Sequence, residues 1–321
     1  MTNRLPSMTP GVTLSVRLGE LELSNPMIAA SGTFGWGLEF ERVVGFSNAD
    51  LGAIVLKGTT LEARSGNASP RIVETAGGAG ILNSIGLENP GVRAVIETYL
   101  PRLKEVKSKV IANVAGSDAA EYCEVTRHFN DCEVIAAIEV NVSCPNVKEG
   151  GMAFGCDARV LSEVVSGVRG CTEKPLIVKL TPNVSDIRVP ARAAVESGAD
   201  ILSLVNTLSG IAVDVRTRRP ILGNVAGGLS GPAIKPVALA RVLDVHRLGL
   251  GVPIIGMGGI VNAEDALEFM ITGARAFSVG TIMFRDPSAP AQILKDLVDQ
   301  CEELGVSDIN DVVGTIDLGS D

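Results

Sequence analysis

Short apolar runs recur along this chain and alternate with longer stretches in which apolar residues return every three or four positions. The short runs are rich in Val and Ile and mostly end in Gly, Pro, Ser or Thr, which is typical of strands buried on both faces of a parallel sheet. After a hairpin around residues 14–23, we expect eight such strands, at 27–30, 53–57, 110–114, 135–142, 176–181, 201–206, 253–257 and 276–279. The helical periodicity predicts helices between them, over 91–106, 117–132, 158–170, 186–197, 232–248, 263–272 and 287–304.

This alternation of strand and helix indicates the fold class. Strands separated by helices form a parallel sheet, and eight strand–helix units close into a (β/α)8 TIM barrel. Such a barrel takes about 250 residues, so a chain of 321 residues leaves room for insertions at 59–90, 145–156 and 207–231. Each insertion follows a strand and belongs at the C-terminal face, where barrel active sites lie. We predict one α/β domain over residues 1–321, with a short N-terminal hairpin and extended loops at that face.

Composition narrows the range of partners. Hydrophobic residues make up 46% of the chain, enough for a large core, and 28 basic against 37 acidic residues give a net charge of -9. Nucleic acid and anionic membranes are therefore not expected as partners. The six cysteines form no CxxC pair, and residues 1–11 lack the apolar stretch of a signal peptide or anchor. We expect a cytoplasmic protein with reduced thiols and no iron–sulfur ligands of its own.

Polar side chains lie at or near the ends of five successive predicted strands: Lys57, Asn113, Asn141, Lys179, Thr181, Asn206 and Thr207. Any one of them could simply face solvent at a strand end. Two lysines and three asparagines on five successive strands would instead converge on one pocket, which favours a binding site at the C-terminal face.

The run EVNVSCPN at 139–146 carries the most distinctive chemistry. In a strand, Glu139, Asn141 and Ser143 share one face, and a polar face inside an apolar strand is costly unless its groups have partners. The chain must turn at the Cys-Pro step, so the thiol of Cys144 is presented at a strand end beside carboxamides and a hydroxyl.

A free cysteine is most often a small buried hydrophobe. Here, however, the only two histidines, His128 and His246, fall in predicted helices away from the C-terminal face. Histidine general-base catalysis and a histidine metal site are therefore disfavoured, and no metal is expected. Cys144 is left as the best candidate for proton transfer.

Glycines follow the last two predicted strands, in the run GMGG at 256–259 and at Gly280-Thr281. They could serve only to make tight turns. In barrels of this kind, however, the loops after strands seven and eight often bind phosphate through backbone N–H groups, and glycine permits the close approach. Because a full GxGxxG is absent, the phosphate is expected to belong to a mononucleotide cofactor such as FMN rather than a dinucleotide.

Eight segments, in order along nearly the whole chain, closely resemble class 1 dihydroorotate dehydrogenases, FMN-dependent barrels of pyrimidine biosynthesis. The segments are NPMIAASGTFG (25–35), KGTT (57–60), NSIGLENPG (83–91), NVSCPN (141–146), KLTP (179–182), VNT (205–207), GGLSGP (227–232) and GMGG (256–259). Each alone is weak, but the combination is specific. Residues 1–10 and the acidic tail after about 306 lie outside it.

The resemblance implies a role for each matching residue. Cys144 would be the base that takes a proton from C5 of dihydroorotate, while the hydride from C6 passes to N5 of FMN. Substrate would be held by Lys57, Asn83, Ser84, Ile85, Gly86, Leu87, Asn141, Asn146, Asn206 and Thr207. FMN would be held by Ser31, Lys57, Gly58, Asn113, Asn141, Lys179, Val205, Gly231, Gly258, Gly259, Gly280 and Thr281. Among these, Lys179 would stabilise charge on the reduced ring.

The family divides by electron acceptor. One branch, class 1A, is a homodimer that reduces fumarate, and the other, class 1B, passes electrons to NAD⁺ through a subunit that carries FAD and a [2Fe–2S] cluster. The loop VKEGGM at 147–152 resembles the second branch. This implies a homodimeric core joined by an iron–sulfur FAD subunit, since this chain has neither cluster cysteines nor a dinucleotide fingerprint.

Two other functions compete. A tRNA dihydrouridine synthase is also an FMN barrel with a catalytic cysteine, but it must hold RNA, which the net charge of -9 disfavours. A non-redox phosphate-binding barrel would keep the glycines after strands seven and eight without needing Asn141, Cys144 and Asn206 together. A flavin spectrum would exclude the second, and turnover of dihydroorotate the first.

Overall fold

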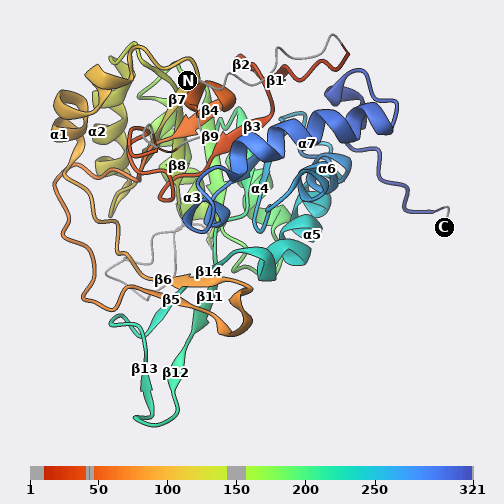
Figure 1. Ribbon diagram of the computed structural model, residues 1–321. Coiled ribbons are helices and arrows are strands. Elements are labelled where there is room, and N and C mark those ends of the chain that lie inside the picture. The colour runs from red at the N-terminus through yellow and green to blue at the C-terminus, as the bar shows by residue number, and fades with distance from the viewer. Residues whose placement is uncertain (1–10, 41–42, 44–46, 143–156, 320–321) are drawn as a thin grey trace.

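Eight parallel strands close into a barrel in the computed structural model, which describes residues 11–40, 43, 47–142 and 157–319 (Figure 1). The barrel strands are β3 (Met27–Ala29), β4 (Ala53–Val55), β7 (Lys109–Val114), β8 (Ile135–Asn141), β9 (Leu176–Leu180), β10 (Ile201–Leu204), β15 (Ile254–Met257) and β16 (Ala276–Val279). Each strand pairs with the next one along the chain, and β16 pairs with β3 to close the ring. These strands overlap the eight predicted runs, and the predicted TIM barrel is confirmed.

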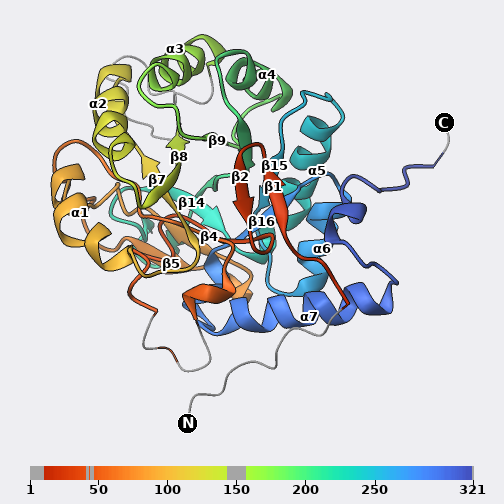
Figure 2. The ribbon, with the colours of Figure 1, turned by 90° about the horizontal axis from the view of Figure 1, so that it is seen from above.

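Helices surround the barrel, as the view along it shows (Figure 2). They are α1 (Val92–Thr98), α2 (Ala119–Asn130), α3 (Ala158–Arg169), α4 (Arg188–Glu196), α5 (Lys235–His246), α6 (Ala263–Ile271) and α7 (Ala289–Glu303). The predicted helix over 91–106 is shorter than expected, because Pro101 falls after α1 and the chain continues as the 3-10 helix η3 (Leu100–Leu103). No helix in the described ranges is both long and apolar enough to cross a membrane.

The first strand–helix unit departs from the expectation of eight equivalent units. Between β3 and β4, the described residues contain only the short 3-10 helix η1 (Asn48–Asp50). Ser47 caps it, accepting a hydrogen bond from the Ala49 N–H, while the side chain of Asp50 accepts one from the Ser47 N–H. The barrel therefore closes although, among the described residues, a short 3-10 helix stands where an α-helix was expected between its first two strands.

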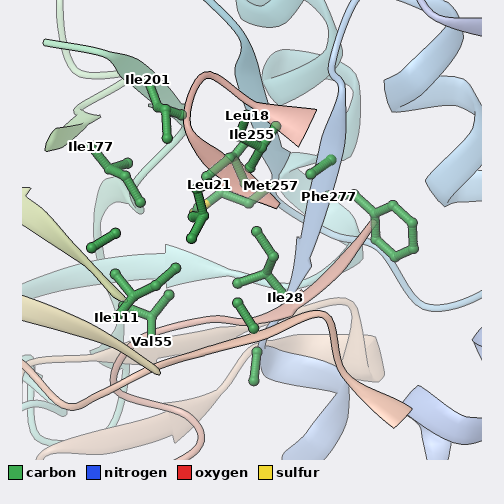
Figure 3. Close-up of a cluster of buried hydrophobic side chains, with 14 of the residues drawn as sticks. Leu18, Leu21, Ile28, Val55, Ile111, Ile177, Ile201, Ile255, Met257 and Phe277 are labelled. Atoms are coloured by element: carbon green, nitrogen blue, oxygen red, sulfur yellow. The ribbon is translucent and has the colours of Figure 1, made fainter. Parts of the chain in front are cut away.

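The N-terminal hairpin covers one end of the barrel. Strands β1 (Val16–Leu18) and β2 (Leu21–Leu23) pair antiparallel, as predicted. Their alternate residues point to one side, and Leu18 and Leu21 are 0% and 3% exposed. Figure 3 shows both leucines among barrel side chains that include Ile255 and Met257. The hairpin lies at the end opposite the insertions (Figure 1), so the C-terminal end is left for the site.

The insertions after β4 and β10 build a second sheet at that C-terminal end. Strands β5 (Ile72–Glu74), β6 (Ile81–Asn83), β11 (Leu208–Ile211) and β14 (Ala226–Ser230) associate in the order β11-β14-β6-β5. A further hairpin, β12 (Val213–Asp214) with β13 (Arg219–Pro220), projects from it (Figure 1). The sequence placed these insertions correctly but did not predict that they pair with one another. The third insertion, 145–156, lies outside the described residues.

Candidate active site

Three polar side chains meet inside the barrel, one from each of the neighbouring strands β7, β8 and β9. Asn113 Nδ2 donates a hydrogen bond of 2.6 Å to Glu139 Oε1, and Lys179 Nζ lies 3.9 Å from the same oxygen. Asn113 and Glu139 are each 1% exposed, and Lys179 is 5% exposed. Lys179 also donates to Ser31 Oγ, just beyond β3, at 3.3 Å. Mutual pairing of this kind is what allows such groups to be buried.

One hydrogen-bond acceptor of this cluster has no partner among the described residues. Asn113 Oδ1 is buried and accepts no hydrogen bond from any residue that the structure describes. Gly58, which follows β4, lies beside it, since a Cβ added there would be 3.0 Å from this oxygen. Buried polar atoms of native proteins almost always have partners. Asn113 Oδ1 is therefore an acceptor placed for a donor that this chain does not itself supply in the described ranges.

The next pair of strand ends is joined by carboxamides. Asn206 Nδ2 donates to Asn141 Oδ1 at 3.1 Å, which connects the loop after β10 to the last residue of β8. Asn206 Oδ1 in turn accepts from the Thr207 N–H at 2.8 Å. On the other side, the fully buried Tyr122 of α2 donates from its hydroxyl to the Asn141 carbonyl oxygen at 2.6 Å. The end of β8 is thus fixed from both its side chain and its backbone.

Asn183 holds the same loop and was not among the predicted site residues. Its Nδ2 donates to Thr181 Oγ1 and to the Thr207 carbonyl oxygen, both at 2.9 Å, and its Oδ1 accepts from the Ser209 N–H at 2.8 Å. These bonds tie the end of β9 to the start of β11. An asparagine directly after the KLTP segment is the signal that could have identified it.

Residues 83–87 approach from the second sheet. Asn83, the last residue of β6, donates from Nδ2 to the Gly228 carbonyl oxygen at 3.3 Å, and Gly228 itself packs against Thr207 so closely that a Cβ could not fit. Leu87 has a φ of 55°, the left-handed region that a branched residue seldom adopts. Its carbonyl oxygen accepts from Asn89 Nδ2 at 2.7 Å, which stabilises this conformation. Such strained backbone is often found at ligand sites.

The glycines of the predicted phosphate loops pack against one another. Gly231, Gly258 and Gly259 have φ values of 98°, 128° and 88°. A Cβ at Gly259 would lie 2.9 Å from the Gly231 carbonyl oxygen, and one at Gly231 would lie 3.5 Å from the Thr281 methyl group. Gly231, Gly259 and Thr281 are thus brought together. Of the two alternatives that the sequence offered, the tight turn is what the structure shows, because the loops themselves require glycine. Close approach of a phosphate stays a prediction.

Lys235 is the lysine that packs on this glycine cluster, 2.9 Å from the added Cβ of Gly259. Its ammonium group is engaged elsewhere, 2.5 Å from Asp265 Oδ1 and 2.6 Å from Glu268 Oε2. Burial lowers the pKa of Lys235, but the hydrogen bonds that its ammonium donates to these carboxylates outweigh this effect and raise the pKa above its usual value. An anion at these loops would therefore be bound mainly by backbone N–H groups and a helix end rather than by this lysine.

The predicted site residues thus fall into three groups, all of which lie near or after the C-terminal ends of barrel strands. The strand-end cluster includes Ser31, Asn113, Asn141, Lys179, Asn206 and Thr207. The end of β6 and the loop after it contribute 83–87, and the glycine loops supply Gly231, Gly258, Gly259, Gly280 and Thr281. Lys57 lies two residues beyond β4, where its N–H donates to the Gly35 carbonyl oxygen, and Val205 is 3% exposed directly after β10. Cys144 and Asn146 lie outside the described residues.

The sequence marks Glu139 as a polar residue in an apolar strand but predicts no role for it. Its position two residues before Asn141, on the same face of β8, was the available signal. Tyr122 gave no signal of this kind, because a tyrosine in an amphipathic helix is ordinarily a core residue.

Comparison of the sequence with known proteins identifies the family to which it is similar. The family model for dihydroorotate dehydrogenase matches residues 13–300. A protein of Desulforamulus reducens named "Dihydroorotate dehydrogenase B (NAD(+)), catalytic subunit" is 52% identical over 307 residues, which is 96% of this chain and 99% of that protein. Proteins with the same name from Geotalea daltonii and Bacteroides thetaiotaomicron are 49% and 47% identical, over 95% of this chain and 98% and 99% of those proteins.

Proposed function

This chain belongs to the dihydroorotate dehydrogenase family, and we propose that it is the catalytic subunit of an NAD⁺-linked dihydroorotate dehydrogenase. It oxidises dihydroorotate to orotate in pyrimidine biosynthesis. The observation that carries this proposal is two sets of polar contacts that share strand β8. Asn113 and Lys179 contact Glu139, and Asn206, in the loop after β10, bonds to Asn141. The resemblance drawn from the sequence and the similarity to named relatives agree.

The residues present fit an FMN cofactor. Asn113 Oδ1 supplies a buried acceptor beside the space left by Gly58, which suits a ring N–H of the flavin. Gly231, Gly259 and Thr281 form the close-packed loops that suit its phosphate. FMN would be held by Ser31, Lys57, Gly58, Asn113, Asn141, Lys179, Val205, Gly231, Gly258, Gly259, Gly280 and Thr281. When bound, FMN supplies the acceptor for the hydride that the substrate loses from C6.

Carboxamides and one lysine would bind the substrate. A carboxamide offers both a donor and an acceptor, which matches the amide edges of a pyrimidine ring. Asn141 and Asn206 are already oriented by their mutual hydrogen bond, and Asn83 is held by Gly228. Lys57 would meet the substrate carboxylate, and Ser84, Ile85, Gly86, Leu87, Asn146 and Thr207 would complete the enclosure. Orienting the ring before reaction lowers the entropic part of the barrier.

Proton removal is assigned to Cys144. Its thiolate would take the proton from C5 of dihydroorotate, because no histidine of this chain belongs to the proposed site. Lys179, paired with Glu139 at 3.9 Å, would place positive charge near the flavin and stabilise the negative charge of its reduced form.

The electron acceptor requires a second protein. The relatives are named NAD(+) enzymes and catalytic subunits, and the sequence has no dinucleotide fingerprint. We propose a homodimeric core of this chain joined by a subunit that carries FAD and a [2Fe–2S] cluster.

The direct test is anaerobic addition of dihydroorotate to the purified chain. We expect the protein to be yellow with about one FMN per chain, and the flavin absorbance to bleach within the mixing time or soon after. A colourless protein that cannot be reconstituted with FMN would contradict the cofactor assignment. A stably bound flavin that dihydroorotate does not reduce would contradict the substrate assignment.

A further inference from the structure

Glu139 is the most deeply buried acidic group of the site, and the proposed reaction does not use it directly. Its side chain is 1% exposed, in the interior of a barrel strand. Burying a carboxylate is costly unless charge and hydrogen bonds compensate it. Among the residues that the structure describes, Asn113 and Lys179 make the compensating contacts, and both are proposed FMN ligands.

The contact with Asn113 sets the orientation of that amide. A carboxylate only accepts hydrogen bonds, so Glu139 Oε1 requires the Nδ2 end of Asn113, 2.6 Å away. The Oδ1 end is then directed elsewhere, and it is this atom that is buried without a described partner beside Gly58. Glu139 thereby makes Asn113 present an acceptor rather than a donor.

The contact with Lys179 sets the local charge. The ammonium lies 3.9 Å from Glu139 Oε1, and Lys179 is 5% exposed. In surroundings so poor in water, one carboxylate strongly offsets the field of one ammonium. Its removal would leave the positive charge uncompensated beside the flavin.

We propose that Glu139 is a positioning residue for FMN, which orients Asn113 as a hydrogen-bond acceptor and offsets the charge of Lys179. The inference rests on the proposed FMN site. Glu139 would then strengthen the binding of oxidised FMN and keep the reduction potential of bound FMN from rising.

Two variants separate these roles. Glu139→Gln keeps the length of the side chain but removes the charge and adds a donor. It should bind oxidised FMN about tenfold more weakly and raise the midpoint potential of bound FMN by about 30 mV, the shift that corresponds to tenfold tighter relative binding of the two-electron reduced form. Glu139→Asp keeps the charge but is one methylene shorter. It should lose FMN affinity through the broken Asn113 contact while its potential stays near that of the unaltered chain.

The potentials are measured by reductive titration against reference dyes, and the affinities by fluorescence titration of apoprotein with FMN, both without dihydroorotate. Glu163→Gln, an exposed glutamate on α3, is the control that makes the same change in net charge. A Glu139→Gln potential equal to that of the control overturns the charge role. Unaltered FMN affinity in both Glu139 variants overturns the orienting role.

If Glu139→Gln fails to retain FMN, a double-mutant cycle with Lys179→Met tests whether the two side chains are paired. The cycle is measured by thermal unfolding of the four apoproteins. We expect the double variant to lose less stability than the sum of the two single-variant losses, because it leaves no unpaired buried charge. Purely additive losses overturn the pairing. Because dihydroorotate is absent throughout, an unaltered chain that binds FMN but does not oxidise dihydroorotate would contradict the proposed function and leave this inference standing.

Discussion

The side chain of Asn206 donates a hydrogen bond of 3.1 Å to Asn141 Oδ1, so that the loop after β10 is tied to the last residue of β8. The two residues are 65 positions apart in the sequence, and their meeting depends on β9 lying between β8 and β10 in the barrel. Because Cys144 follows Asn141 by three residues, this bond joins a proposed substrate ligand to the strand that leads to the proposed base.

Replacing Asn206 with aspartate should weaken substrate binding. The variant is isosteric but has no donor for Asn141, and it places a negative charge beside a substrate that is itself an anion. We expect kcat/KM for dihydroorotate to fall about 10- to 100-fold, the usual loss when a hydrogen bond in a charged setting is removed, mainly through KM. Steady-state kinetics with a dye as acceptor measure this. An unchanged KM would place Asn206 outside the substrate site.

Replacing Cys144 with alanine should slow proton removal while FMN stays bound, since the thiol is assigned to the substrate. Reduction of the flavin by dihydroorotate should fall by about 10² to 10⁴, the usual contribution of a positioned acid–base group. Cys144→Ser should keep some activity at higher pH, because a hydroxyl is a much weaker acid than a thiol. Stopped-flow absorbance measures both variants. Near-normal rates in Cys144→Ala would require another base.

Gly259→Ala tests the glycine loops. Alanine would be strained at a φ of 88°, and its Cβ would lie 2.9 Å from both the Gly231 carbonyl oxygen and Lys235 Cβ. Strain at positive φ alone costs about 1 to 2 kcal/mol, and backbone crowding adds to it. We expect lower thermal stability and loss of most of the FMN.

Gly249→Ala is the matched control for that experiment. Gly249 also has a positive φ, 59°, but an added Cβ would meet no atom within 4 Å. It should lose stability through strain alone and keep its FMN. Equal FMN content in the two variants would show that the crowded glycine loops do not hold the cofactor.

The barrel could be predicted from the sequence because each strand carries its own local signal. Ile135–Asn141 and Leu176–Leu180 are mainly apolar runs with β-branched residues and a polar residue at or next to the last position, and both were located to within two residues. The second sheet could not be predicted in this way. Its strand Ala226–Ser230 is rich in glycine, and its pairing with Ile81–Asn83 connects segments about 145 residues apart. No local periodicity reports such a contact.

The site was predictable to a similar degree. Asn113, Lys179 and Asn206 stood out as polar residues at or near the ends of apolar strands. In the structure, Asn113 and Lys179 both contact Glu139, and Asn206 bonds to Asn141 on the same strand as Glu139. Asn183 was missed because its role lies in bonds to the backbone of Thr207 and Ser209, which depend on the path of a loop. The order of strands can be inferred from the sequence, whereas the path of a loop depends on tertiary contacts.

Cys123 gives a prediction about pH and stability. It lies on α2 beside Cys171, which follows α3, and burial, then a hydrogen bond with the Cys171 thiol, raises the pKa of Cys123 to about 11. A pKa raised in the folded state means that the protonated thiol stabilises the fold. This contribution is complete below the unfolded value of about 8.5 and is lost as the pH rises towards 11.

Urea unfolding between pH 8 and pH 10.5 measures that loss. The midpoint of the unaltered chain should fall more steeply with pH than that of Cys123→Ala, in which this thiol is missing and the other titrating groups are the same. Parallel pH profiles for the two proteins would show that Cys123 titrates normally in the folded state.

The lone chain should reduce its FMN with dihydroorotate but should not reduce NAD⁺ at a useful rate. The sequence has no dinucleotide fingerprint, and the Asn113 acceptor proposed for the flavin is almost fully buried, a poor place for a nicotinamide ring to reach. Addition of a subunit carrying FAD and a [2Fe–2S] cluster should restore NAD⁺ reduction, because the cluster can take electrons one at a time.

The decisive assay compares fumarate and NAD⁺ as acceptors with and without that subunit. Efficient fumarate reduction by the lone chain would assign it to the homodimeric branch and remove the need for a partner. Direct NAD⁺ reduction by the lone chain would instead reveal a nicotinamide site that neither the sequence nor the described residues indicate.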